Sequence, residues 1–282
     1  MGRVDLHVHS TASDGEHPPD DVARRAAAAG LSAMALTDHD TTDGVVPAQQ
    51  AAPPGLTIIA GCEFSAAAPW GEMHLLAYFL PVSSADLQGF LSTQRAHRTE
   101  RMQGIVDRLG TLGLAVTLDD VRAEAGSGAL GRPHAARALV TRGVVGHLQE
   151  AFDRFLGRGR GAYVPKVLPD VAEVTGLVDR LGGVTSAAHL GAVATDEHVR
   201  WLREQGVTAI EVVHPAHDDA RRRRIRQLAD RVGLLPTGGS DWHGVAQEQG
   251  ARRAPLGGLD VPEVWLHQLE RARPAGREHQ RA

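Results

Sequence analysis

The chain has 282 residues, of which 42% are hydrophobic and 23% are charged, so it can bury a sizeable core and is not globally disordered. Asp and Glu (34) outnumber Lys and Arg (30), and the net charge of −4 argues against nucleic-acid binding driven by bulk positive charge. The single cysteine, Cys62, excludes a disulfide framework and a thiolate metal site. The 15 histidines are therefore the informative part of the composition.

No apolar stretch approaches the roughly 18–20 residues that a membrane-spanning helix needs. The first residues, Met1 to His7, contain no apolar segment of the kind that precedes secretion. We therefore expect a cytoplasmic protein.

Short apolar runs alternate with amphipathic helical patterns along the chain. The predicted strands are 4–8, 33–37, 56–60, 74–79, 183–188, 209–213 and 234–237. Helix signals lie between most of them: one helix opens at Pro18-Pro19 and closes at Gly30, and others run from Pro169 to Gly182 and from Asp218 to Gly233. Strands separated by helices indicate βα units and a largely parallel sheet, and seven strands are enough to close a barrel.

Residues 84–165 interrupt this alternation, because they show helical periodicity and glycine loops without a convincing strand. Helices are predicted over 84–112, 133–142 and 147–156. We therefore expect a helical insertion, residues 84–165, between strands four and five. The barrel would comprise residues 1–83 and 166–273, and residues 274–282 would form a flexible tail. We expect the insertion to cap the barrel and select the substrate.

Histidines and carboxylates gather at the ends of the predicted strands. His7 and His9 flank Val8, so both imidazoles lie on one face of the first strand. Similar residues accompany other strands: Asp38 and His39 after the second, Glu63 after the third, His74 at the start of the fourth, His189 after the fifth, His214 after the sixth, and Asp241 and His243 after the seventh. The carboxyl ends of barrel strands are where functional groups converge.

Imidazoles and carboxylates without thiolates suit Zn²⁺, Mn²⁺ or Fe²⁺. Packing many such groups in one pocket without a cation is unfavourable, because buried carboxylates repel each other and buried imidazolium loses hydration. Glu63 could bridge two cations, and two cations about 3.5–4 Å apart form a clamp used to hydrolyse phosphate esters. A cation can lower the pKa of bound water from about 15.7 to about 7, so no Ser or Cys nucleophile is needed. We expect Cys62 to be a packing residue.

Five motifs together resemble the PHP (polymerase and histidinol phosphatase) superfamily of metal-dependent phosphoesterases. They are Asp5-Leu6-His7-Val8-His9-Ser10, Ser13-Asp14-Gly15, Thr37-Asp38-His39-Asp40, Gly131-Arg132-Pro133-His134 and Gly239-Ser240-Asp241-Trp242-His243-Gly244. The stretches 151–157 and 163–165 are similar to the stand-alone branch that contains 5′-AMP phosphatases, nucleoside 3′,5′-bisphosphate phosphatases and a 5′–3′ exoribonuclease. The resemblance covers nearly the whole chain.

The resemblance implies an α/β fold, a distorted (β/α)7 barrel, with two or three divalent metal ions (Mn²⁺, Fe²⁺ or Zn²⁺). It implies three ligand sets: His7, His9, Glu63 and Asp241 for the first ion, Glu63, His74 and His134 for the second, and Asp14, His39 and His243 for the third. Asp38 and Asp5 would orient imidazoles, and His189 or a metal-bound water would assist the leaving group. The substrate would be a nucleotide phosphomonoester, such as 5′-AMP or a 3′,5′-bisphosphate, or the 5′ end of a short RNA, attacked by metal-bound hydroxide. No membrane and no obligate protein partner is implied.

The fifth-strand motif departs from the family pattern, because Leu190 and Gly191 follow His189 where the family usually has Pro and, shortly after, Arg. A phosphate contact is then missing or replaced. Arg132 and Lys166 are candidates to bind phosphate, since charge-assisted bonds to oxyanions are strong. His214 and His217 are further candidates to line the substrate pocket.

Two other functions remain open. An amidohydrolase-type C–N hydrolase also carries His-x-His on its first strand, but such barrels often use a bridging modified lysine, and the sole lysine, Lys166, does not end a core strand. A catalytically inactive PHP module acting in assembly is the second alternative. The complete ligand set and the lack of any polymerase region argue against it.

Overall fold

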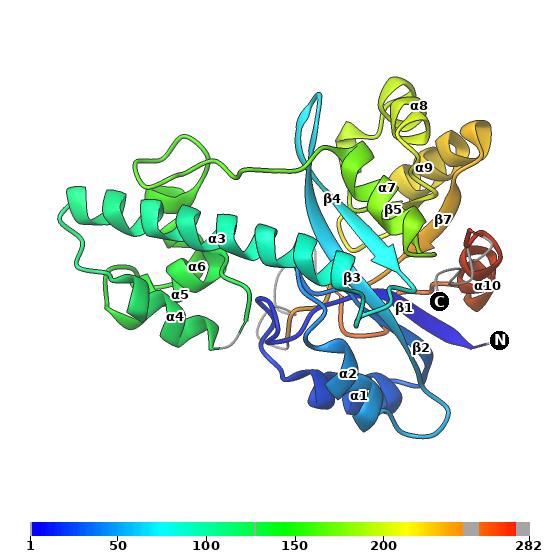
Figure 1. The fold of residues 1–282 in the computed structure, drawn as a ribbon, viewed down its shortest axis with the longest axis horizontal. Coiled ribbons are helices and arrows are strands. Elements are labelled where there is room, and N and C mark those ends of the chain that lie inside the picture. The colour runs from blue at the N-terminus through cyan, green and yellow to red at the C-terminus, as the bar shows by residue number, and fades with distance from the viewer. Residues whose placement is uncertain (1, 127, 245–253, 275–282) are drawn as a thin grey trace.

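The structure is a computed structural model that describes residues 2–126, 128–244 and 254–274. Its elements in chain order are β1 (Arg3–Val8), α1 (Pro19–Ala28), β2 (Leu31–Leu36), α2 (Val45–Ala51), β3 (Thr57–Ala68), β4 (Gly71–Tyr78), α3 (Ala85–Thr111), α4 (Leu118–Ala125), α5 (Arg132–Thr141), α6 (Leu148–Ala151), a π-helical turn (Phe152–Leu156), α7 (Val171–Arg180), β5 (Val184–Ala187), a 3₁₀ turn (Gly191–Val193), α8 (Asp196–Glu204), β6 (Ala209–Val213), α9 (Asp219–Val232), β7 (Leu235–Gly238) and α10 (Glu263–Arg271) (Figure 1). Most of the predicted flexible tail, residues 275–282, lies outside the described residues.

The strands form one seven-stranded sheet in the order β1-β2-β3-β4-β5-β6-β7. Strands β1 to β3 and β5 to β7 are parallel, whereas β4 is antiparallel to both neighbours. The segment after β7 hydrogen-bonds to β1, because the amide of Asp241 donates to the carbonyl of His7 (2.9 Å) and the amide of His9 donates to that of Trp242 (2.9 Å). The α/β class and the seven strands are thus confirmed. We call the sheet with α1, α2 and α7 to α10 the barrel.

The predicted third strand is too short and the fourth begins too late. Strand β3 continues past residue 60 to Ala68, and a tight turn at Pro69-Trp70 leads into β4. Gly71 has φ 122°, a conformation that favours glycine at such a turn. Because β4 is antiparallel, its beginning lies beside the far end of β3, with His74 opposite Ser65. This reversal is what brings His74 to the same edge of the sheet as the carboxyl ends of the parallel strands.

The helix signals in the sequence act as expected in the barrel. Pro19 occupies the first turn of α1, where its missing amide hydrogen is tolerated. In α9 the carboxylate of Asp218 accepts a hydrogen bond from the amide of Arg221 (2.8 Å), and Gly233 ends the helix in the left-handed conformation with φ 75°.

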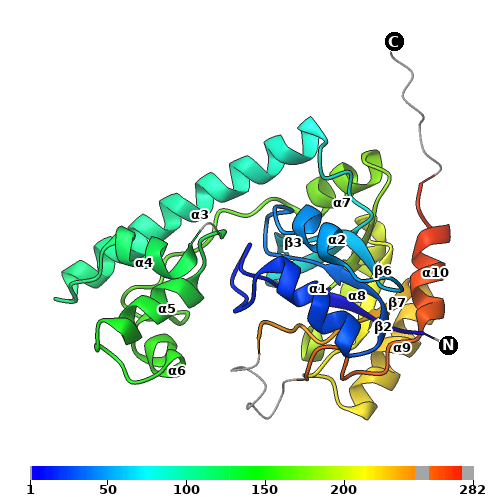
Figure 2. The ribbon, with the colours of Figure 1, turned by 90° about the horizontal axis from the view of Figure 1, so that it is seen from below.

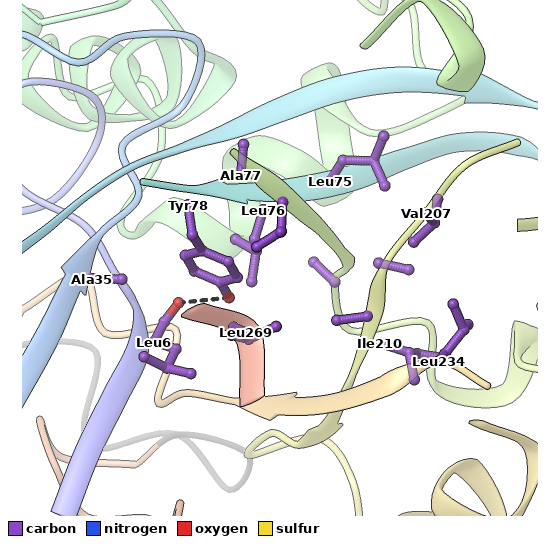
Figure 3. Packing of buried hydrophobic residues seen from close by; sticks show 14 of the residues in the cluster. Leu6, Ala35, Leu75, Leu76, Ala77, Tyr78, Val207, Ile210, Leu234 and Leu269 are labelled. Carbon is purple, nitrogen blue, oxygen red and sulfur yellow. Dashed lines mark hydrogen bonds between the residues drawn. The ribbon is translucent and has the colours of Figure 1, made fainter. Parts of the chain in front are cut away.

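The hydrophobic core has separate parts in the barrel and in the insertion. Figure 3 shows Leu6, Leu76, Ile210 and Leu269 in the main barrel core, where the hydroxyl of Tyr78 donates to the carbonyl of Leu6 (3.0 Å). A second cluster is built from side chains of the insertion, and a third lies beneath α1 and α2. Figure 2 shows α3 to α6 gathered beside the barrel, with α3 running along the group. We therefore propose residues 84–165 as a separate subdomain.

The insertion is joined to the barrel by buried polar contacts. Nε of Arg98 in α3 donates to the Asp40 carboxylate (2.7 Å), and the amide of Ala129 donates to the carbonyl of Ala12 (3.0 Å). These contacts place α3 and the start of α5 against the loops that follow β1 and β2. Within the described residues, no helix is long and apolar enough to cross a membrane.

Candidate metal centre

Strand β1 delivers two fully buried imidazoles. His7 and His9 point to the same side of the strand, and neither side chain has measurable exposure. Gly239 after β7 lies so close to β1 that an added Cβ would be 2.4 Å from the Cβ of His7. Glycine at this position therefore allows the end of β7 to pack directly behind the first histidine.

Glu63 in β3 lies at the middle of a ring of five imidazoles. Its Oε2 atom is 3.3 Å from Nε2 of His7 and 3.2 Å from both Nε2 of His9 and Nδ1 of His39. Its Oε1 atom is 2.8 Å from Nδ1 of His74 and 3.0 Å from Nε2 of His189. One buried carboxylate thus turns each oxygen toward a different group of ring nitrogens. This is the arrangement expected of a ligand that bridges two cations.

Asp241 and Asp14 supply two more carboxylates to the same space. Oδ1 of Asp241 is 3.2 Å from Nε2 of His7 and 3.3 Å from Nε2 of His9. Asp14, in the loop after β1, has Oδ1 3.4 Å from Nε2 of His243 and Oδ2 4.0 Å from Nε2 of His39. Asp241 has φ 51°, so its backbone bends sharply at the end of β7 to turn the carboxylate inward.

Three groups of residues have ligand atoms close enough together to hold a cation. They are His7, His9, Glu63 and Asp241; His9, Asp14, His39 and His243; and His39, Glu63 and His74. The group of His7, His9, Glu63 and Asp241 is identical to the ligand set implied for the first ion. The group that contains Asp14, His39 and His243 is the ligand set implied for the third ion, with His9 added. The last contains His39 where the resemblance places His134.

His134 itself lies in the first turn of α5, outside these groups of described residues. Its Nδ1 atom accepts a hydrogen bond from the amide of Gly131 (3.0 Å). Burial, together with nearby Arg137, lowers the pKa of His134 to about 4 and keeps the ring neutral at pH 7. A role for His134 as a metal ligand stays a prediction.

The charges in the centre are strongly coupled. Burial opposes ionisation of Glu63, but His39, His74 and His7 outweigh it and hold its pKa well below the usual value. Burial opposes protonation of His9, yet the carboxylates of Asp241 and Glu63, 3.3 Å and 3.2 Å from its Nε2 atom, raise its pKa to about 10. Glu63 is therefore ionised, and protons on His7 and His9 compensate its charge. Divalent cations could replace those protons.

The donor set fits metal ions. Both ring nitrogens of His9 and Nδ1 of His39 are buried and have no hydrogen-bond partner among the described residues, although Glu63 is close. Unpartnered buried nitrogens are unfavourable. A cation would use these nitrogen lone pairs together with the carboxylate oxygens. Imidazole and carboxylate ligands suit Zn²⁺, Mn²⁺ and Fe²⁺.

Glu211 in β6 is a functional residue that the sequence analysis passed over. Its Oε1 atom is 3.0 Å from Nδ1 of His7, and its Oε2 atom accepts a hydrogen bond from the amide of His189 (2.8 Å). A carboxylate behind a ligand histidine fixes the ring and its tautomer. The sequence does indicate a role for this residue, because Glu211 is the only charged residue in the apolar run 209–213.

Asp38 and Asp5 contact backbone and hydroxyl groups instead of the imidazoles expected for them. Asp38 accepts hydrogen bonds from the amide and the hydroxyl of Ser10 (both 2.7 Å) and from the hydroxyl of Ser13 (2.6 Å). Asp5 accepts from the amides of Ser240 (2.9 Å) and Gly257 (3.0 Å). Both carboxylates therefore shape the loops that carry the ligands. A direct catalytic role for Asp38 stays a prediction.

His214 and His217 use their ring nitrogens for internal contacts. Nδ1 of His214 accepts from the amide of Ala216 (3.1 Å), which leaves its Nε2 hydrogen facing Oδ2 of Asp241 (3.4 Å). Nε2 of His217 accepts from the amide of Gly191 (3.2 Å). His214 thus steadies a candidate ligand and His217 steadies the turn after His189. Substrate contact by either histidine stays a prediction.

Lys166 lies where the insertion meets the barrel, whereas Arg132 lies within the insertion at the start of α5. Nζ of Lys166 is 2.5 Å from Oε1 of Glu72 and donates to the Ser65 hydroxyl (2.9 Å). The Arg132 guanidinium lies over the rings of Phe152 (5.8 Å) and Tyr163 (5.7 Å). Lys166 is thus next to His74, because Glu72 also contacts Nε2 of that ring (3.4 Å).

The chain matches a family model and several known proteins. Residues 5–119 match the PHP domain model. A 5′–3′ exoribonuclease of Haemophilus influenzae is 32% identical over 247 residues, covering 86% of this chain and 90% of the relative. A 3′,5′-nucleoside bisphosphate phosphatase of Chromobacterium violaceum is 31% identical over 252 residues, covering 86% of this chain and 88% of the relative.

Solved structures agree with these matches over nearly the whole chain. A Bifidobacterium adolescentis protein, assigned by prediction as a metal-dependent phosphoesterase, is 32% identical and superposes with a TM-score of 0.85, covering 94% of each chain. A Chromobacterium violaceum structure described as an amidohydrolase with bound sulfate and no metal is 28% identical and has a TM-score of 0.83, covering 97% of this chain and 98% of that one. The chain therefore belongs to the PHP superfamily of metal-dependent phosphoesterases.

Proposed function

We propose that this protein hydrolyses phosphomonoesters of nucleotides, such as 5′-AMP or 3′,5′-bisphosphates, or the 5′ end of short RNA, with two or three divalent cations. The observation that carries the proposal is Glu63, whose two carboxylate oxygens each face separate imidazoles within 3.3 Å. The relatives named above act on nucleotides or RNA, which supports the substrate class.

The residues of the three groups described above would hold the cations, which we propose to be Mn²⁺, Fe²⁺ or Zn²⁺. When bound, these ions supply positive charge to the phosphate oxygens and lower the pKa of water. Glu211 behind His7 and His214 beside Asp241 would hold their partners in fixed orientations. Deep burial of His7, His9 and Glu63 keeps bulk water away from the inner ligands.

His189 is the residue we assign to the leaving group. Its side chain is 30% exposed, whereas the neighbouring His7 and Glu63 are buried, so it can reach a bound substrate. Its backbone, with φ 31°, is held by the hydrogen bond from its amide to Glu211. A proton on Nε2 of His189 would pass to the departing ester oxygen. General acid catalysis of this kind contributes typically 10²–10⁴-fold.

The insertion would select the substrate, because it joins the barrel at Lys166, which is close to His74 through Glu72. Lys166, at its junction with the barrel, and Arg132, at the start of α5, are the proposed phosphate-binding residues. Arg132 belongs to the insertion, and Lys166 is the first residue of the barrel segment that follows it. This division would leave metal binding to the barrel and substrate choice to the insertion.

The test is release of phosphate, or of a nucleotide from RNA, by purified protein loaded in parallel with Mn²⁺, Zn²⁺ or Fe²⁺. The panel should contain 5′-AMP, nucleoside 3′,5′-bisphosphates and short 5′-phosphorylated RNA, with Glu63→Gln as the inactive variant and Glu173→Gln, an exposed change on α7, as the control. We expect turnover of at least one nucleotide by the wild type and by the control. No turnover of any member with any metal would refute the function.

An amidohydrolase activity is the second candidate, and the description of the Chromobacterium violaceum structure favours testing it. Lys166, the only lysine of the chain, does not fit the role of a bridging ligand, because it pairs with Glu72 and Ser65. Glu63 occupies the bridging position instead. Turnover of a cyclic amide without turnover of any phosphoester would favour this candidate.

Fewer than one metal ion per chain would favour an inactive module.

A further inference from the structure

The loop between β1 and α1, which carries Asp14, packs tightly against the insertion. The amide of Ala129 donates to the carbonyl of Ala12 (3.0 Å), so a backbone hydrogen bond joins the two segments. Gly128 comes closer still, because a Cβ added to it would be 2.7 Å from the carbonyl oxygen of Ser13. Glycine therefore permits an approach between two backbones that a side chain would prevent. Figure 2 shows this loop extending from the barrel toward the insertion.

The ring of His134 extends this contact to Asp14. Its Nδ1 atom accepts a hydrogen bond from the amide of Gly131 (3.0 Å), so the proton of the neutral ring is on Nε2. Burial lowers the pKa of His134, whereas the carbonyl of Ser13 and the carboxylate of Asp14 are close enough to the ring to act in the opposite direction. The imidazole thus lies between the start of α5 and the loop that holds Asp14.

A second contact joins the insertion to the neighbour of another candidate ligand. Arg98 in α3 has Nη2 2.6 Å and Nε 2.7 Å from one carboxylate oxygen of Asp40, the residue after His39. The other oxygen of Asp40 accepts a hydrogen bond from the amide of Ser65 (3.2 Å). Asp40 has φ 49°, so the chain turns sharply directly after His39. Arg98 therefore holds the turn that follows this histidine.

Both contacts lie beside the same group of candidate ligands. We call this group the Asp14 site, and it consists of His9, Asp14, His39 and His243. The Asp241 site shares only His9 with it and consists of His7, His9, Glu63 and Asp241. Among the described residues, no hydrogen bond or ion pair joins the insertion to a ligand of the Asp241 site, whose His7 and Asp241 contact Glu211 and His214 of the barrel. The insertion thus holds the surroundings of one site, whereas the barrel holds those of the other.

Every ligand of both sites belongs to the barrel. We propose that docking of the insertion nevertheless positions Asp14 and His39, so that the Asp14 site needs the insertion to bind its cation tightly and the Asp241 site does not. This inference rests on the proposed function, because it divides the cations of that centre by what supports them. Loss of contacts that orient ligands typically lowers metal affinity. Gly128, His134 and Arg98 are then positioning residues, and His134 acts through the loop of Asp14.

The experiment is equilibrium dialysis of the metal-free protein against graded Zn²⁺, with bound zinc counted per chain by elemental analysis. Gly128→Ala should push the loop and the insertion apart, because the added Cβ would meet backbone oxygens. One cation per chain should then bind 10–100-fold more weakly, the usual effect of losing an outer partner. The other zinc should bind as in wild type. Arg98→Met should weaken the same cation from the His39 side.

The affected cation is identified with Asp14→Asn, which removes a ligand of the Asp14 site directly. The double variant Gly128→Ala with Asp14→Asn should lose no more zinc affinity than Asp14→Asn alone, because both changes act on one cation. His134→Asn provides a second test if Gly128→Ala does not fold, since it keeps the acceptor for Gly131 but lacks the far ring nitrogen. Its loss should likewise not add to that of Asp14→Asn.

Gly110→Ala, in α3 of the insertion, is the matched control. A Cβ added there meets no atom of the described residues within 4 Å beyond its own helix, so zinc binding should equal that of wild type. Three results would overturn the inference and leave the metal centre intact: wild-type zinc binding by folded Gly128→Ala, equal weakening of every cation, or losses that add to that of Asp14→Asn. Wild-type protein that binds no zinc would instead refute the proposed function.

Discussion

Nδ1 of His7 lies 3.0 Å from Oε1 of Glu211, and both side chains are completely buried. The pair crosses from β1 to β6, so it spans the sheet behind the candidate metal centre. Because Nδ1 faces Glu211, Nε2 faces Glu63 and Asp241. The Glu211 carboxylate thus leaves Nε2 as the nitrogen of His7 that is available to a cation.

Glu211→Gln should weaken metal binding. The amide loses the charge that fixes the His7 ring, and loss of such an outer partner typically costs 10–100-fold in metal affinity or activity. Titration of the metal-free protein with Zn²⁺, with His7→Asn for comparison, measures the change. An affinity for Glu211→Gln equal to that of wild type would show that Glu211 does not orient His7.

His189→Asn should lower kcat in a way that depends on the leaving group. If His189 protonates the departing oxygen, kcat for a ribose phosphate should fall roughly 10²–10⁴-fold. For p-nitrophenyl phosphate, whose leaving group needs no proton, the loss should be much smaller. Equal losses on both substrates would mean that His189 acts on binding or on the metal centre instead.

Arg98→Met should destabilise the contact between insertion and barrel. The change leaves the charge of Asp40 buried without its partner, which costs about 3–5 kcal/mol. Chemical denaturation of the purified variant measures the loss. The double variant Asp40→Asn with Arg98→Met should recover part of it, because asparagine is neutral and tolerates the backbone of Asp40, which has φ 49°. Equal stabilities of the single and double variants would argue against a buried-charge penalty.

His134 should make the stability of the protein sensitive to mild acid. Burial lowers its pKa in the folded chain to about 4, against an ordinary value of 6.5. The folded state therefore favours the neutral ring, and this contribution is complete above pH 6.5 and is lost as the pH falls toward 4. The maximum loss is about 3 kcal/mol, from roughly 1.36 kcal/mol per pKa unit.

The variant His134→Asn isolates this effect, because its amide oxygen can accept the hydrogen bond from Gly131 but cannot titrate. The free energy of unfolding of the metal-free variant should fall less than that of wild type between pH 6.5 and 4. Parallel pH profiles for the two proteins would contradict the assignment.

The sequence predicted the seven strands and the helices between the fourth and the fifth, because these depend on local patterns. Apolar runs marked the strands, and His7, Glu63 and Asp241 stood at or near their ends. The hairpin of β3 and β4 was not predicted, because the prediction relied on strands that alternate with helices, whereas a tight turn joins these two antiparallel strands. Ending β3 at residue 60 placed Glu63 after the strand, whereas it lies inside it.

Contacts that depend on tertiary packing could not be predicted. Arg98 and Arg101 lie in a charged segment that is typical of a solvated helix, yet the return of segment 166–168 buries both. Asp38 and Glu211 show the same limit, because sequence spacing cannot tell which carboxylate faces an imidazole and which faces a serine. In each case the partner lies on a segment distant in the chain.

The most direct test is anomalous diffraction at the zinc edge from crystals of the protein grown with Zn²⁺. The central claim is that Glu63 bridges cations held by imidazoles from several strands. It predicts at least two zinc peaks flanking the Glu63 carboxylate, each at roughly 2.0–2.2 Å from one of its oxygens. Zinc peaks that all lie away from Glu63, or no zinc peak among these imidazoles, would contradict it.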